Sequence, residues 1–216
     1  VKIFDMVQSG LSQFGSIPFG HGELMTLFGH YKSPNDKIYN LLKKGKIIKL
    51  KKGLYINGAT NRNKPLNEKV IANSLYGPSY LSFDTALSFH GIIPERVTII
   101  QSVTTKRSKC FENPVGYFTY KYAPAAYYFI GVSWFTSGIN EAFLMATPEK
   151  ALCDKIVYTK NLNIRSVKGL AEFLFEDMRY EEENISVFDT DIIRKCSLVG
   201  KKQKTLRLLI KLIEKL

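Results

Sequence analysis

SPNDKIYNLLKKGKIIKLKKGLYI, residues 33–56, is the stretch of sequence that decides the fold of the N-terminal part of the chain. Its first half predicts a helix, because Ser33 suits an N-cap and Pro34 suits the first helical position. Apolar side chains then recur at spacings of three and four at Ile38, Leu41 and Leu42, which places them on one face of that helix.

The second half of this stretch predicts a β-hairpin. Gly45 is expected to end the helix, and apolar and polar residues then alternate as in strands over residues 46–50 and 54–56. Lys51-Lys52-Gly53 joins the two strands, and Gly53 supplies the positive φ that a tight hairpin turn needs. A short helix followed at once by a lysine-tipped hairpin is typical of a winged helix-turn-helix, in which the helix enters the DNA major groove.

Two further helices are predicted upstream, over Val1 to Phe14 and over Gly22 to Phe28. Together with residues 33–56 they complete a winged helix-turn-helix domain over residues 1–60. On the predicted second helix of the motif, Asn35, Lys37 and Asn40 are the candidates for base contacts, because Asn pairs with adenine and Lys with guanine. The candidates for phosphate contacts are Lys43, Lys49, Lys51 and Lys52.

The distribution of charge agrees with a polyanion partner for this domain. Residues 1–64 hold 11 Lys/Arg against 3 Asp/Glu, residues 65–200 hold 14 against 15, and residues 201–216 hold 6 against 1. The formal net charge of +12 is therefore concentrated at the two ends of the chain. A basic solvated surface without a partner is the alternative interpretation.

Residues 65–216 predict a larger, mixed α/β domain with a helical C-terminal tail, so that the fold class of the whole chain is α+β. Thr147-Pro148-Glu149 is a strong helix start, for a helix that runs to about Tyr158. The other predicted helices cover residues 66–75, 84–90, 166–177, 189–196 and 201–216, and the predicted strands cover residues 80–82, 97–103, 115–122, 126–134 and 142–146.

Several functional classes receive no support from the sequence. Cys110, Cys153 and Cys196 have neither the spacing of a zinc site nor that of a disulfide framework, and the three His are isolated. We therefore expect no metal, no cofactor and no enzymatic activity. Glu149 and Asp154 are expected to serve the helix start and a local ion pair, and Asp189 to cap a helix.

Neither a secretory signal nor a membrane span is expected. Asp5 and Gln8 interrupt the early apolar run, and apolar stretches of about 18 residues are lacking, so we expect a cytoplasmic protein without a membrane partner. The helix predicted over residues 201–216 has one apolar and one basic face. A membrane surface, nucleic acid, a protein partner and its own domain are the possible neighbours of this helix.

Three segments of the chain resemble the AbiEi-type antitoxin family. Residues 45–56 (GKIIKLKKGLYI) are similar to the wing of that family, residues 80–92 (YLSFDTALSFHGI) to a helix that follows it, and residues 146–156 (ATPEKALCDKI) to a later helix. Residues 104–109 (TTKRSK) also fit the pattern, and the order and spacing of the segments match together.

The resemblance implies a two-part antitoxin of a type IV toxin–antitoxin system. Its winged helix would bind inverted repeats in operator DNA and repress its own operon. Its larger domain would neutralise a partner toxin that resembles nucleotidyltransferases, without a stable complex being required. An antitoxin that acts by direct toxin binding, and whose winged helix has lost DNA binding, is the alternative.

Overall fold

The computed structural model describes residues 10–138 and 141–216. The helix predicted over Val1 to Phe14 lies mostly outside the described residues. Within the part of this range that the structure describes, residues 10–12 are helical. The protein is mixed α+β, as the sequence predicts. It divides into two compact units: the first comprises the chain up to Gly77 together with Phe111–Tyr117, and the second comprises Pro78–Cys110 and Phe118–Leu216.

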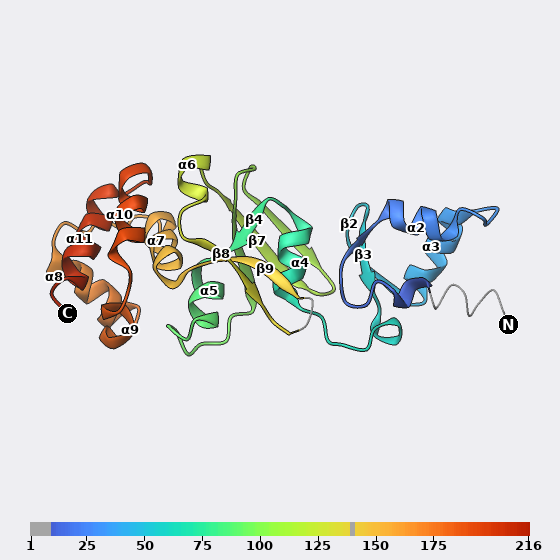
Figure 1. Ribbon diagram of the computed structural model, residues 1–216, viewed down its shortest axis with the longest axis horizontal. Helices are drawn as coiled ribbons and strands as arrows, with labels where there is room; N and C mark the ends of the chain where they lie inside the picture. The colour runs from blue at the N-terminus through green and yellow to red at the C-terminus, as the bar shows by residue number, and fades with distance from the viewer. Residues whose placement is uncertain (1–9, 139–140) are drawn as a thin grey trace. The chain divides into compact units, whose positions relative to one another are not determined.

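The first unit has two helices packed on a small sheet (Figure 1). Strand β1 (Phe19–Gly20) leads into α2 (His21–Phe28), and α3 (Pro34–Lys43) leads into β2 (Ile47–Lys51) and β3 (Leu54–Asn57). The sheet order is β1-β3-β2, and both pairings are antiparallel. Its core includes Leu24 and Phe28 from α2, and Ile38 and Leu41 from α3.

The predicted helix–hairpin boundary is confirmed in detail. Gly45 has φ +64° just after α3, and Gly53 has φ +77° in the hairpin turn. Ser33 is the N-cap residue of α3, but its side chain makes no capping hydrogen bond, so it acts there through its backbone conformation alone.

The first unit extends beyond residue 60, where the sequence predicts its end. After η1 (Ala59–Asn61), helix α4 (Glu68–Leu75) also belongs to it, as does Phe111–Tyr117, which covers the end of β6, the following turn and the start of β7. Polar side chains explain this extension, because Lys51 donates to the Leu75 carbonyl and Asn113 donates to the Leu50 carbonyl.

A six-stranded mixed sheet has the strand order β6-β7-β5-β4-β9-β8; β4, β7, β8 and β9 are labelled in Figure 1. Strand β4 pairs parallel with β9 and antiparallel with β5, and β8 pairs antiparallel with β9. The strands are β4 (Ser79–Leu81), β5 (Ile99–Thr104), β6 (Lys109–Asn113), β7 (Gly116–Tyr122), β8 (Val132–Thr136) and β9 (Ala142–Ala146).

Helices of the second unit pack on this sheet and on one another. Helix α5 contacts α7 and β5, α7 contacts β9, and α10 and α11 lie side by side (Figure 1). The helices are α5 (Phe83–Phe89), α6 (Ala125–Tyr128), α7 (Pro148–Tyr158), α8 (Val167–Ala171), the π-helical η2 (Glu172–Asp177), α9 (Glu182–Ser186), α10 (Thr190–Val199) and α11 (Gln203–Ile213).

Most predicted elements of this unit are confirmed, and one is wrong in part. Helix α7 begins at Pro148 with the Thr147 hydroxyl capping it, and Asp189 caps α10. Residues 126–134, predicted as one strand, instead contribute to α6 and then to β8. Pro124 starts a helical turn there, and Tyr127 and Tyr128 are buried by it.

The amphipathic C-terminal helix packs on its own unit. The apolar face of α11 is buried through residues that include Leu206, Leu209 and Ile213, and α11 contacts α7, α8 and α10. Its apolar face is thus unavailable to a membrane surface. Among residues 10–138 and 141–216, helices of the length and apolar character needed to cross a membrane are absent.

Candidate functional site

The outer face of α3 carries most of the predicted base-contacting residues. Because Ile38 and Leu41 are buried in the core of the first unit, the opposite face of α3 is turned to solvent. Asn35, Asn40 and Lys43 are exposed, as a role in DNA contact requires.

Two aromatic residues modify this face. The ammonium of Lys37 lies 5.0 Å from the centroid of the Tyr31 ring, a cation–π contact that holds a half-buried side chain in place. Tyr39, which is 65% exposed, stands on the same helix as the predicted contacts and was not among the sequence candidates. An aromatic ring on the polar face of a basic helix is the signal that identifies it, because such a ring packs well on sugars and bases.

The hairpin presents two exposed lysines, Lys49 and Lys52. Lys51 differs, because its ammonium donates to the Leu75 carbonyl at 2.6 Å. That carbonyl belongs to the last turn of α4, where the helix dipole favours a cation. Lys51 therefore has a structural role inside the unit, and Lys49 and Lys52 are the better phosphate candidates.

Amide side chains fix the base of the hairpin. Asn57 donates to the carbonyls of Leu11 and Gly15, at 2.7 and 3.0 Å, and Asn61 donates to the carbonyl of Lys46 at 2.9 Å. Buried amides that satisfy backbone carbonyls in this way hold loops rigidly. The hairpin is accordingly attached to the preceding chain and is not a free arm.

The second unit contains a fully buried charged cluster. Lys150 and Asp154, both on α7, form an ion pair with a 3.3 Å separation of Nζ and Oδ1. Tyr80 and Ser82 donate their hydroxyls to Asp154 Oδ2, at 3.0 and 2.6 Å. Lys150 also donates to the Tyr127 carbonyl at 3.0 Å and lies over the Tyr127 ring.

This cluster joins the two later segments of the family resemblance. Tyr80 and Ser82 come from residues 80–92, and Lys150 and Asp154 from residues 146–156. Burial raises the pKa of Tyr80 well above its ordinary value, and the Asp154 carboxylate that accepts its hydrogen bond raises it further. The local ion pair predicted for Asp154 is confirmed, while its burial and its hydroxyl partners were not predicted.

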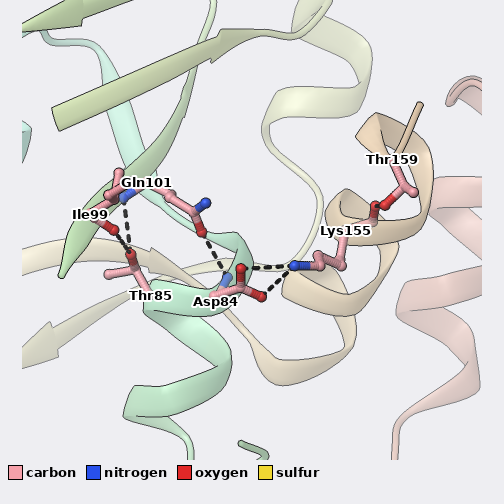
Figure 2. Close-up of polar contacts among 6 residues, drawn as sticks. All are labelled: Asp84, Thr85, Ile99, Gln101, Lys155 and Thr159. Atoms are coloured by element: carbon pink, nitrogen blue, oxygen red, sulfur yellow. Dashed lines mark hydrogen bonds and ion pairs between the residues drawn. The ribbon is translucent and has the colours of Figure 1, made fainter. Parts of the chain in front are cut away.

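A second ion pair joins the same two segments at the surface. Lys155 Nζ contacts both carboxylate oxygens of Asp84, at 2.7 and 2.8 Å (Figure 2). Glu149 lies in the first turn of α7, as expected, and also accepts a hydrogen bond from the backbone N–H of Asp189 at 3.2 Å. The charged side chains of residues 146–156 therefore bond α7 to three neighbouring elements: α5, β4 and the start of α10.

Comparisons with known proteins give no family. No family model and no curated protein matches the chain. Among the described residues, a grouping of three or more His, Cys, Asp or Glu side chains suited to a metal ion is lacking.

Proposed function

We propose that the chain is a DNA-binding antitoxin that represses its own operon and neutralises a nucleotidyltransferase-like toxin. The first half of the proposal is supported by one observation above all, the exposure of Asn35, Asn40, Lys43, Lys49 and Lys52 on a helix and the hairpin that directly follows it.

The order and pairing of the elements support the same assignment. Strand β1 precedes α2 and pairs with β3, so that the hairpin β2–β3 becomes part of a three-stranded sheet. In a winged helix-turn-helix protein the second helix of the motif inserts in the major groove, and the hairpin contacts the flanking backbone. Asn35 and Asn40 then contact bases, and Lys43, Lys49 and Lys52 contact phosphates.

The antitoxin half of the proposal rests on the resemblance of residues 80–92 and 146–156 to AbiEi-type antitoxins. It gains support from the contact between these segments through Asp154 and through Asp84. The two segments are distant in sequence but are hydrogen-bonded and ion-paired to each other. Sequence motifs that characterise one domain are expected to contact each other in this way.

Fluorescence anisotropy with a labelled duplex from the region upstream of the gene tests the DNA-binding half. The variant K49A/K52A is expected to lose affinity for every duplex, and its plot of log K against log salt should flatten by about two units, since each lost phosphate contact removes about 0.9. K64A/K160A serves as a charge-matched control, because both lysines are exposed and lie outside α3 and the β2–β3 hairpin.

The variant N35A/N40A is expected to act differently from the lysine variant. It should lose affinity for the upstream duplex but keep its affinity for a scrambled duplex, because base contacts carry the sequence preference. If K49A/K52A and K64A/K160A lost equal affinity for DNA, the assignment of Lys49 and Lys52 as phosphate contacts would be contradicted.

A further inference from the structure

The second unit contains a cleft of about 370 Å³ that the proposed function does not use. It lies among the start of α5, the segment that leads into β5, helix α7 and the segment after η2. Its polar lining includes Asp84, Glu95, Arg96, Gln101 and Lys155. The volume is in the range of sites that take small molecules.

The backbone next to this cleft is strained. Phe83, a buried aromatic residue directly before Asp84, has φ +54°, in the left-handed region that favours glycine. Such strain persists when surrounding bonds impose it, and it concentrates at functional sites. Here the Ser82 hydroxyl donates to Asp154 at 2.6 Å, and the Ser82 N–H donates to the Gln101 carbonyl at 2.9 Å.

These bonds fix a carboxylate and an amide side by side. The Asp84 N–H donates to Gln101 Oε1 at 3.0 Å, which settles the orientation of the Gln101 amide group (Figure 2). The two N–H groups of Gln101 Nε2 are then left without a partner among the described residues. The Asp84 carboxylate, although bonded to Lys155, keeps lone pairs for further donors.

The remainder of the lining is apolar with balanced charge. Ile93, Ile99 and Met178 line the cleft, and Ile99 is 41% exposed although its side chain is large and apolar. The two cations, Arg96 and Lys155, are matched by the two carboxylates, Asp84 and Glu95. A flat, partly apolar ligand with a small charge suits such a lining better than a polyanion.

We propose that this cleft binds a guanine nucleotide, in the monophosphate form. Gln101 donates to the base carbonyl O6, and the Asp84 carboxylate accepts from the neighbouring N1–H and N2–H groups. Ile99 and Met178 flank the plane of the base, and Arg96 contacts the phosphate. Guanine is favoured because it alone among the common bases offers a carbonyl next to two adjacent donors.

Isothermal titration calorimetry on the intact chain at physiological salt tests this proposal, with GMP, guanosine, AMP and GTP as the probes. GMP is expected to bind at least about tenfold more tightly than AMP, the effect of one lost charge-assisted hydrogen bond. GTP is expected to bind no more tightly than GMP, because Glu95, the sequence neighbour of Arg96 in the cleft lining, repels further phosphate groups.

Two variants separate the contacts. R96A is expected to weaken GMP by about tenfold and to leave guanosine unchanged. D84N is expected to remove the preference for GMP over AMP, and its circular-dichroism melting curve checks that it is folded. K160A, which removes one exposed cation outside the cleft, is the matched control for R96A.

The proposal would be overturned if the intact chain failed to bind GMP at about 1 mM, a concentration that detects the weakest specific sites. Equal binding of GMP and AMP would also overturn it, as would equal effects of R96A and K160A. Tighter binding of GTP without base preference would likewise overturn it, because that is the behaviour of a merely basic surface. The inference concerns the second unit and stands apart from both the DNA-binding and the toxin-neutralising halves of the proposed function.

Discussion

Replacing Lys150 by Met tests how the second unit is held together. Lys150 and Asp154 are both 0% exposed, and their atoms lie 3.3 Å apart. K150M keeps most of the side-chain volume but leaves the Asp154 carboxylate buried without a cation, and it removes the bond to the Tyr127 carbonyl. Breaking a buried pair in this way costs about 3–5 kcal/mol of the free energy of unfolding.

Two other ion pairs provide a graded comparison. In the Lys155–Asp84 pair the side chains are 22% and 27% exposed, and in the Lys168–Glu172 pair they are 88% and 61% exposed. K155M is expected to cost about 1 kcal/mol and K168M less than about 0.5 kcal/mol, since solvent screens exposed pairs. Urea unfolding followed by circular dichroism measures all three variants. A cost of K150M no greater than that of K155M would refute the reasoning.

The remaining predictions concern thiols, alkaline pH and one glycine. Cys110 is exposed, whereas Cys153 and Cys196 are buried. Ellman's reagent should therefore modify one thiol quickly in the folded protein and all three thiols in urea. Rapid modification of all three thiols in the folded protein would show that α7 and α10 are not packed as described. Burial raises the pKa of Tyr80 and of Tyr127, so these phenols stay protonated in the folded protein, whereas in the unfolded chain they lose their protons near pH 10. The free energy of unfolding should therefore fall as the pH rises past 10, and it should fall less steeply in Tyr80→Phe. A Cβ on Gly58 would lie 1.9 Å from the Gly45 carbonyl oxygen, so G58A should destabilise the protein by roughly 2 kcal/mol or more, whereas G22A, where a Cβ meets no atom within 4 Å, should not destabilise it.

The sequence predicts the first unit well, because its signals are local. The apolar spacing of Ile38, Leu41 and Leu42, and the turn glycines Gly45 and Gly53, act within a few residues of one another. The exposure of Asn35, Asn40, Lys49 and Lys52 follows from the same periodicity. The role of Lys51 could not be predicted, because its partner Leu75 is 24 residues away.

The second unit is harder to predict because its decisive contacts join distant residues. Asp154 is hydrogen-bonded to Tyr80 and Ser82, which are more than 70 residues away in the sequence. No local sequence pattern predicts such a contact. The wrong strand over residues 126–134 has a local cause, since an aromatic-rich run favours a strand while Pro124 starts the short helix α6. The positive φ of Phe83 is likewise invisible in the sequence, because tertiary bonds impose it on a residue that does not favour it.

Expression in cells together with the adjacent gene product, with growth and a promoter reporter recorded in parallel, tests the central claim most directly. The intact chain is expected to repress the reporter and to restore growth, and N40A/K49A/K52A to restore growth without repression. Failure of the intact chain to restore growth would contradict the antitoxin assignment. Full repression by N40A/K49A/K52A would contradict the assignment of α3 and the β2–β3 hairpin as the surface that binds DNA.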